Sequence, residues 1–103
     1  MQIQTVGIVG AGTMGNGIAQ ACAVAGLKVT MIDVSEAALS KGMGTIGKSL
    51  ERLLGKDKIT ESDKAAALTR IQCSTRPEDL RGVDLVIEAA TENQAIKIKI
   101  LQQ

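Results

Sequence analysis

The sequence contains no Phe, Tyr, Trp or His among its 103 residues. Histidine and paired cysteines are the commonest transition-metal ligands in proteins, and no C-x-x-C pair is present either, so we expect no metal site. Without aromatic side chains there is no stacking platform for nucleic-acid bases, and no basic block takes its place. Because a small enzyme that lacks all four residue types would be unusual, we expect the chain to be part of a longer protein.

Long apolar runs and a strong charge of one sign are also missing. The net charge is +1, from 12 basic and 11 acidic residues. The longest apolar stretch is far shorter than a bilayer span, and the start lacks a charged leader with an apolar segment. The two cysteines, Cys22 and Cys73, are expected to be buried small hydrophobes rather than a disulfide. These features predict a cytoplasmic protein with no membrane partner.

The most informative motif is G-x-G-x-x-G, which directly follows the apolar run 5–9 and opens a helical pattern. In a dinucleotide-binding fold the first glycine permits a tight turn, the second lets the pyrophosphate approach the backbone, and the third lets the helix lie close to the strand. The helix N-terminus offers free N–H groups to the phosphates. We therefore expect cofactor contacts from Gly10, Ala11, Gly12, Thr13, Met14 and Gly15.

Asp33 closes the next apolar run, 21 residues after Gly12, close to the roughly 20 that the fingerprint requires. Its carboxylate could accept hydrogen bonds from the adenosine ribose and would repel a 2′-phosphate. Val34 supplies no cation to hold such a phosphate. The pattern thus favours NAD over NADP. A glycine-rich structural turn without a ligand is the competing interpretation, and the spacing weighs against it.

Periodicity predicts an α/β fold of the Rossmann type. Strands are expected at 5–9, 28–32, 71–74 and 83–88, in a parallel sheet of order 3-2-1-4, which is incomplete because the complete fold has about six strands. Helices are expected at 13–25, 35–54 and about 60–68, so that a helical pair is inserted between the second and third strands. The first helix should bury an apolar face made of Met14, Ile18, Ala21, Cys22 and Ala25.

The last segment, 96–103, is ambiguous. Its alternation of Lys and Ile favours a strand, whereas Ile96, Ile100 and Leu101 fit one helix face. We predict a helix, because a parallel sheet needs a crossover at this point. No stop signal closes this element, so residues 1–103 are interpreted as the N-terminal portion of an NAD-binding domain. A further C-terminal helical domain would lie outside this sequence.

The whole chain resembles the N-terminal part of the 3-hydroxyacyl-CoA dehydrogenase family, most closely its bacterial 3-hydroxybutyryl-CoA dehydrogenases. The extension M-G-x-G-I-A-Q at 14–20 and the stretch E-A-x-x-E-N at 88–93 are more specific than the glycine motif alone. The stretches that carry the resemblance are 6–20, 32–33, 49–53 and 84–93.

The resemblance implies site residues beyond the glycine turn. Glu92 and Lys97 match positions that contact NAD, and Lys97 also approaches the CoA substrate. Ser49 and Lys56 match positions that contact CoA. These two are seven residues apart, close to two helical turns, so they would share a face if the helix continued that far. Without the resemblance, Ser49 would be interpreted as a neutral surface residue and Lys56 as a cation answering the helix dipole.

The resemblance also implies what this chain lacks. The family's catalytic His, paired with a Glu, lies further along, so we expect no catalytic residue here and no activity from this chain alone. The parent would be a homo-oligomer, a dimer, that interconverts 3-hydroxyacyl-CoA and 3-oxoacyl-CoA with NAD. A stand-alone, non-catalytic NAD-binding or regulatory module is the alternative. A 6-phosphogluconate or hydroxyisobutyrate type of dehydrogenase is disfavoured by the inserted helical pair and by residues 88–93.

Overall fold

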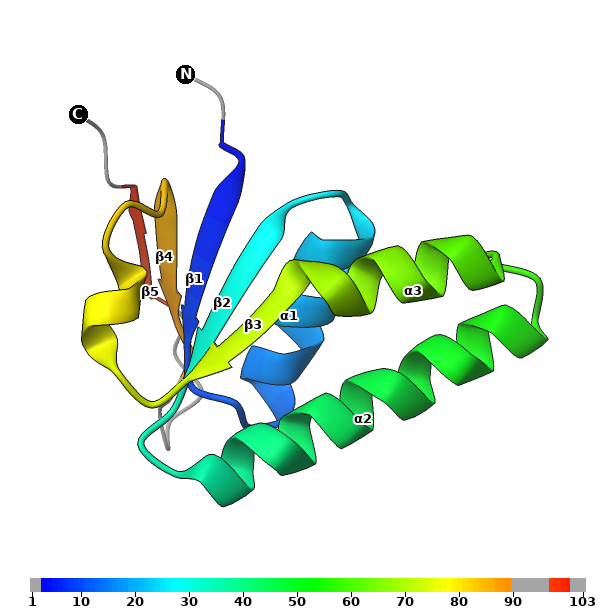
Figure 1. Cartoon of the computed structure of the whole chain (residues 1–103), viewed down its shortest axis with the longest axis horizontal. Helices are drawn as coiled ribbons and strands as arrows, with labels where there is room; N and C mark the ends of the chain where they lie inside the picture. The colour runs from blue at the N-terminus through cyan, green and yellow to red at the C-terminus, as the bar shows by residue number, and fades with distance from the viewer. Residues whose placement is uncertain (1–2, 90–96, 101–103) are drawn as a thin grey trace.

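The computed structural model describes residues 3–89 and 97–100, which form one sheet with helices packed on it (Figure 1). The sheet has the strand order β3-β2-β1-β4-β5. Strands β1 to β4 run parallel, and β5 runs antiparallel to β4. In chain order the elements are β1 (Thr5–Val9), α1 (Thr13–Val24), β2 (Lys28–Ile32), α2 (Glu36–Gly55), α3 (Glu61–Arg70), β3 (Ile71–Ser74), the 3-10 helix η1 (Pro77–Leu80), β4 (Leu85–Glu88) and β5 (Lys97–Ile100).

The predicted order 3-2-1-4 and the inserted pair α2–α3 are confirmed, and local signals explain most boundaries. Ser35 caps α2 by accepting a hydrogen bond from the Ala38 N–H. Thr60 and Asp63 form a capping box at the start of α3. Gly26 follows α1 with φ +101°, as a glycine just past a helix end should.

The end of α2 lies one residue beyond the predicted limit at residue 54. Gly55 is still helical, Lys56 is the C-cap, and Asp57 adopts the left-handed conformation with φ 56°. The Lys58 N–H then donates to the Leu53 carbonyl at 2.9 Å, and the Asp57 N–H donates to the Leu54 carbonyl at 3.1 Å. These two bonds make a Schellman ending, in which a short polar residue occupies the position usually held by glycine.

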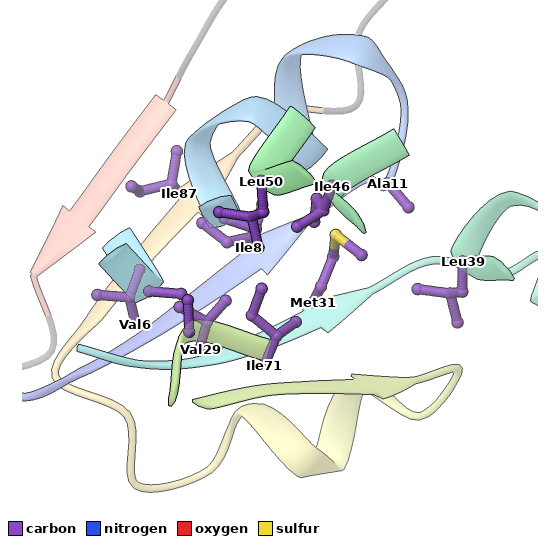
Figure 2. Close-up of a cluster of buried hydrophobic side chains, with 13 residues drawn as sticks. Val6, Ile8, Ala11, Val29, Met31, Leu39, Ile46, Leu50, Ile71 and Ile87 are labelled. Carbon is purple, nitrogen blue, oxygen red and sulfur yellow. The ribbon is translucent and has the colours of Figure 1, made fainter. Parts of the chain in front are cut away.

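The core lies between the sheet and the three α-helices (Figure 2). Alternate residues of β1 and β2 point into it, because side chains of a strand alternate between the two faces of a sheet. Gly7, between two of them, faces the other side, where an added Cβ would meet Leu80 at the end of η1. The largest fully buried side chains are Ile8, Met31, Ile46, Leu50, Val6 and Val29.

The buried face of α1 is rotated from the predicted one. Its buried residues are Gly15, Asn16, Ala19 and Ala23, whereas Ala21 and Ala25 are exposed. An added Cβ at Gly15 would overlap the carbonyl group of Gly10, so backbone meets backbone at this point. That contact sets the rotation of the helix, and only small residues fit along the line that continues from Gly15. Larger side chains such as Met14 and Ile18 are half-buried beside it.

Cys73 corrects a second expectation. It is exposed rather than buried, whereas Cys22 is half-buried, and both are free thiols. Cys73 belongs to β3, the edge strand of the sheet, and borders a hollow between β3 and α2. Leu39, Ser40 and Met43 of α2 line the same hollow, so the helix does not close over the strand there.

The helix predicted for 96–103 is wrong where the structure describes it. Residues Lys97–Ile100 form β5, which pairs with β4 in antiparallel register from Leu85↔Ile100 to Glu88↔Lys97. An antiparallel neighbour is reached by a short reversal and needs no crossover, so the premise of a parallel continuation fails. The edge of β4, which would otherwise present unpaired N–H and C=O groups, is paired by β5.

Asp84 ties the start of β4 to the start of β1. Its Oδ2 accepts hydrogen bonds from the backbone N–H groups of Gln4 at 2.8 Å and Thr5 at 3.2 Å, and from the Thr5 hydroxyl at 3.2 Å. The Asp84 N–H donates to the Thr5 carbonyl at 3.0 Å. The backbone hydrogen bond from Gln4, followed by that from Thr5, lowers the pKa of the Asp84 carboxyl.

Within the described residues, no helix has the length and apolar character needed to cross a bilayer.

This arrangement predicts a pH-dependent role for Asp84. A carboxyl whose pKa is lowered in the folded state stabilises that state above its unfolded pKa of about 3.9, and the effect is lost as the pH falls through the folded pKa. We expect Asp84→Asn to lower the unfolding midpoint at pH 7 and to differ little from the unaltered protein in strong acid. Urea unfolding followed by circular dichroism tests this. Asp57→Asn, which removes a carboxylate at the end of α2, is the control; equal behaviour of the two variants would contradict the assignment.

The packing of α1 predicts opposite effects for two glycines of the same helix. Gly15→Ala places a methyl group against the Gly10 carbonyl and is expected to destabilise the fold by about 1–3 kcal/mol. Gly17→Ala meets nothing within 4 Å and is expected to stabilise it by up to about 1 kcal/mol, through helix propensity. Thermal unfolding of both variants measures the difference. Destabilisation by Gly17→Ala equal to that by Gly15→Ala would show that the backbone contact does not set the helix.

Candidate functional site

The glycine turn lies at the carboxyl end of β1, between β2 and β4 in the sheet. From β1 the chain crosses to β2 and β3 on one side, and from β3 it returns to β4 on the other side of β1. The strand order therefore reverses beside β1. In open α/β sheets, ligands bind outside the carboxyl ends of the strands at such a switch point. The topology thus places the sequence motif where a ligand site is expected.

The three glycines of the turn occupy positions with different geometric requirements. Gly10 has φ +108°, a conformation that other residues rarely adopt, and its N–H donates to the Ile32 carbonyl at 2.6 Å. Gly15 makes the close backbone approach described above. Gly12 is the N-cap of α1, and an added Cβ there would meet nothing within 4 Å. Gly12 is therefore not required by packing within the described residues, which leaves its open side available to a ligand.

The N-terminus of α1 lacks the side-chain cap and the acidic residues found at the N-termini of α2 and α3. The starts of α2 and α3 are capped by Ser35 and Thr60, and both helices carry acidic residues in the first turn. In α1, no side chain caps the start, and the first turn holds no acidic residue. The first N–H groups of a helix have no intrahelical partner and carry the positive end of the helix dipole. This end of α1 therefore suits an anionic group such as a phosphate.

Asp33, at the end of β2, is half-buried and bonded to the backbone on both sides. Its Oδ2 accepts a hydrogen bond from the Ala11 N–H at 3.0 Å. Its Oδ1 accepts one from the Ser35 N–H at 3.0 Å. The sequence pattern predicts only a ribose contact for this carboxylate and gives no sign of its bond to the glycine turn. The bond to Ser35 is an Asx turn, for which the D-x-S spacing is a signal. Val34, between them, is 94% exposed.

Asn16 is a site residue that the sequence analysis missed. It is the only buried polar side chain among residues 3–89, and its Nδ2 lies 3.5 Å from the Ala11 carbonyl, to which it donates. A buried amide needs such a partner, because an unpaired one would cost free energy. Its position one residue after Gly15, in a helix of small apolar residues, was the available signal.

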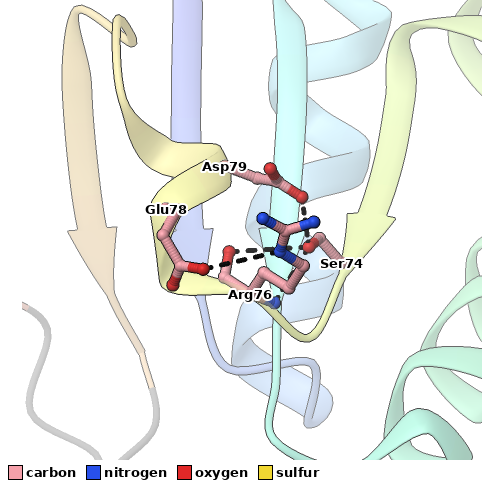
Figure 3. Close-up of polar contacts among 4 residues, drawn as sticks. All are labelled: Ser74, Arg76, Glu78 and Asp79. Carbon is pink, nitrogen blue, oxygen red and sulfur yellow. Dashed lines mark hydrogen bonds and ion pairs between the residues drawn. The ribbon is translucent and has the colours of Figure 1, made fainter.

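The segment that follows β3 is held by polar contacts among its own residues (Figure 3). The Ser74 hydroxyl donates to the Asp79 carboxylate at 2.6 Å and accepts from the Arg76 N–H at 2.9 Å. The Asp33 N–H donates to the Ser74 carbonyl at 3.2 Å. These bonds attach η1 to the carboxyl end of β3. Because β3, β2 and β1 are parallel neighbours, their carboxyl ends lie along the edge of the sheet that also holds the glycine turn.

The residues assigned to CoA do not gather at the glycine turn. Ser49 is half-buried in the second half of α2, and Lys56 is exposed at its C-cap. At 1.5 Å per residue, Ser49 lies about 10 Å along the helix from Gly42, the residue of α2 that meets Ala11 of the turn. Figure 1 shows that α2 begins near the carboxyl ends of the strands and extends away from them. Because the helix ends at Gly55, the shared face predicted for this pair holds only up to the cap.

The remaining predicted residues lie at the limit of the described structure. Glu92 lies outside the described residues. The backbone of Lys97 begins β5 and is paired with Glu88, the last residue of β4. That pairing brings residue 97 to the carboxyl end of β4, the edge of the sheet where the glycine turn lies.

Comparisons with known proteins point to the same kind of site, a dinucleotide-binding domain. Residues 5–103 match the family described as 3-hydroxyacyl-CoA dehydrogenase, NAD binding domain. A 3-hydroxybutyryl-CoA dehydrogenase of Bradyrhizobium diazoefficiens is 46% identical over 101 residues, which cover 98% of this chain and 34% of that protein. A second one, from Mycobacterium tuberculosis, is 44% identical and is covered to 35%.

Solved structures show the same likeness. The crystal structure of (S)-3-hydroxybutyryl-CoA dehydrogenase from Ralstonia eutropha has a TM-score of 0.86 and 65% identity, over 89% of this chain and 32% of that one. That of 3-hydroxybutyryl-CoA dehydrogenase from Escherichia coli has a TM-score of 0.86 and 37% identity, over 89% and 20%. The chain spans about a third of the length of the curated relatives it matches. The chain belongs to the NAD-binding domain family of the 3-hydroxyacyl-CoA dehydrogenases.

Proposed function

We propose that this chain is the cofactor-binding part of an oxidoreductase that interconverts 3-hydroxybutyryl-CoA, or a close 3-hydroxyacyl-CoA, with its 3-oxoacyl-CoA. NAD, when bound, accepts the hydride from C3 of the substrate, and the protein holds and orients it. The observation that carries the proposal is the glycine turn with an uncapped helix start and Asp33 beside it. These residues fit NAD: an open Gly12, a start of α1 without an acid, and a carboxylate at the end of β2.

In this proposal the pyrophosphate lies at residues 10–15 and the adenosine ribose at Asp33. Both carboxylate oxygens of Asp33 already accept one backbone hydrogen bond, and each has a second lone pair for a ribose hydroxyl. The carboxylate is therefore aimed by the backbone before a ribose arrives. A 2′-phosphate beside it would meet like charge, and the neighbouring Val34 offers no cation, which favours NAD over NADP.

We propose no catalytic residue among these 103 residues. The hydroxyl proton of the substrate must leave with the hydride, and a base that works at neutral pH is most often histidine, which the sequence does not contain. The similar 3-hydroxybutyryl-CoA dehydrogenases of Bradyrhizobium diazoefficiens and Mycobacterium tuberculosis are about three times as long, so the base is assigned to a part of the protein outside this chain. This chain alone is expected to give no turnover.

The substrate contacts in this chain are assigned to Ser49, Lys56 and Lys97, and further NAD contacts to Glu92 and Lys97. A hydroxyl and ammonium groups suit the phosphates of CoA. The position of Ser49 and Lys56 far along α2 supports a ligand group distant from the reacting carbon, such as the CoA handle. We propose a cytoplasmic homo-oligomer, a dimer, as the working assembly.

The first test is cofactor preference in the complete protein. We expect it to oxidise NADH in the presence of acetoacetyl-CoA with a higher kcat/KM than NADPH. In the double variant Asp33→Ser, Val34→Arg the preference should shrink or reverse, because the repelling carboxylate is replaced and a cation is added. NADH binding should also weaken, since the variant loses the bond to the Ala11 N–H.

Val34→Arg alone is the matched control, because Val34 is exposed and Asp33 stays in place. It should keep most of the preference for NADH. No turnover with either cofactor in the unaltered protein would refute the proposed reaction, and equal discrimination by all three proteins would refute the role of Asp33.

The second test separates CoA binding from cofactor binding. In the complete protein, Ser49→Ala and Lys56→Ala should raise KM for acetoacetyl-CoA and leave KM for NADH nearly unchanged. An exposed ionic contact contributes about 0.2–1 kcal/mol, so the effect of Lys56→Ala should be severalfold. The turnover number should change little, because these contacts hold ground and transition states alike. Lys48→Ala, an exposed lysine on the same helix, is the control. A rise in KM for NADH instead would contradict the assignment.

A further inference from the structure

The peptide groups around Ala11, the middle of the glycine turn, are held at several points. Ala11 is 2% exposed, and its N–H donates to the Asp33 carboxylate at 3.0 Å. Its carbonyl oxygen accepts from the Asn16 amide at 3.5 Å. The turn is thus attached to β2 through one of its groups and to α1 through the other, without any ligand.

A third element, α2, presses on the same carbonyl through Gly42. A Cβ added to Gly42 would lie 2.8 Å from the Ala11 carbonyl oxygen and 3.4 Å from the Ala11 Cβ. It would also lie 3.4 Å from the Met31 Cε, a fully buried side chain of β2. Protein interiors are close-packed, so small side-chain movements alone cannot make room for a side chain at position 42. Because the nearest atom belongs to the backbone, any side chain at position 42 requires the turn or the helix to move.

The other two glycines in the middle of α2 provide a contrast. An added Cβ at Gly44 or Gly47 would meet nothing within 4 Å. All three glycines weaken the helix, since glycine is a poor helix former. Among these three positions, packing of the described residues requires a glycine only at Gly42. Gly42 lies on the buried face of α2 with Leu39, Ile46 and Leu50.

We propose that Gly42 is a positioning residue for cofactor binding. Through the absence of a side chain at this position, α2 sets where the Ala11 carbonyl lies, and therefore where the following Gly12 and the start of α1 lie. This inference rests on the proposed NAD-binding function, in which those backbone groups meet the cofactor's phosphates. It also means that the inserted helix assigned to CoA recognition is in direct contact with the turn assigned to NAD.

The experiment is NADH binding to the complete protein, measured by calorimetric titration, for Gly42→Ala against Gly44→Ala and Gly47→Ala. Hydrogen bonds to charged groups are strong and depend on geometry, so we expect Gly42→Ala to weaken NADH binding about tenfold or more, with both controls within about twofold of the unaltered protein. Amide hydrogen exchange is the second readout. Ala11 and Gly12 should exchange faster in Gly42→Ala than in either control.

Where Gly42→Ala alone lowers the folded fraction, the substitution is made together with Gly44→Ala and Gly47→Ala, whose helix propensity restores stability. The triple variant is then compared with the Gly44→Ala, Gly47→Ala double variant. Loss of thermal stability with unchanged NADH affinity would show that Gly42 is only a packing residue, and so would equal losses of affinity in all three single variants. Absence of NADH binding in the unaltered protein would instead refute the proposed function itself.

Discussion

The contact on which most of this structure depends is the approach of two backbones where β1 turns into α1. Gly10 turns the chain with a positive φ, and Gly15 lies against its carbonyl with no room for a side chain. This contact fixes the rotation of α1, so that Ala19 and Ala23 follow Gly15 into the core. It also aims the uncapped start of α1 at the edge of the sheet where β1, β2 and β3 end.

The turn is stabilised by groups that come from three other parts of the chain. Asp33, just after β2, and Asn16 of α1 bond to the two polar groups of Ala11, and Gly42 of α2 packs against it. A binding loop that is already held in place loses little entropy when a ligand arrives, which is the advantage of preorganisation. In the proposed function the same arrangement would link cofactor binding to the inserted helices, since α2 cannot shift toward the turn without displacing Ala11.

Sequence patterns predicted the parallel part of the fold well, because their signals are local. The glycine motif and the acid at Asp33 occupy the expected places at the ends of β1 and β2. The caps at Ser35 and Thr60 depend on residues three positions apart. The bonds of Asp33 and Asn16 to Ala11 were not foreseen, because both go to backbone groups of the turn, which no residue type along the chain marks as partners. The ligand contacts assigned to residues 10–15 and Asp33, and to Ser49, Lys56, Glu92 and Lys97, stay predictions.

The errors arose where the answer depends on which surfaces meet. The hydrophobic pattern of α1 pointed to Met14 and Ala21, yet backbone contact at Gly15 turned a different face inward. The pattern at 97–100 fits a strand, and only pairing along the open side of β4 decided its direction. Cys73 looked buried by composition, but its strand lies at the edge of the sheet. Turns, caps and strand propensity act between near neighbours and can be inferred from residue order. Helix rotation, strand direction at an edge and the closeness of Gly42 to Ala11 depend on packing between segments distant in sequence, so only the folded structure reveals them.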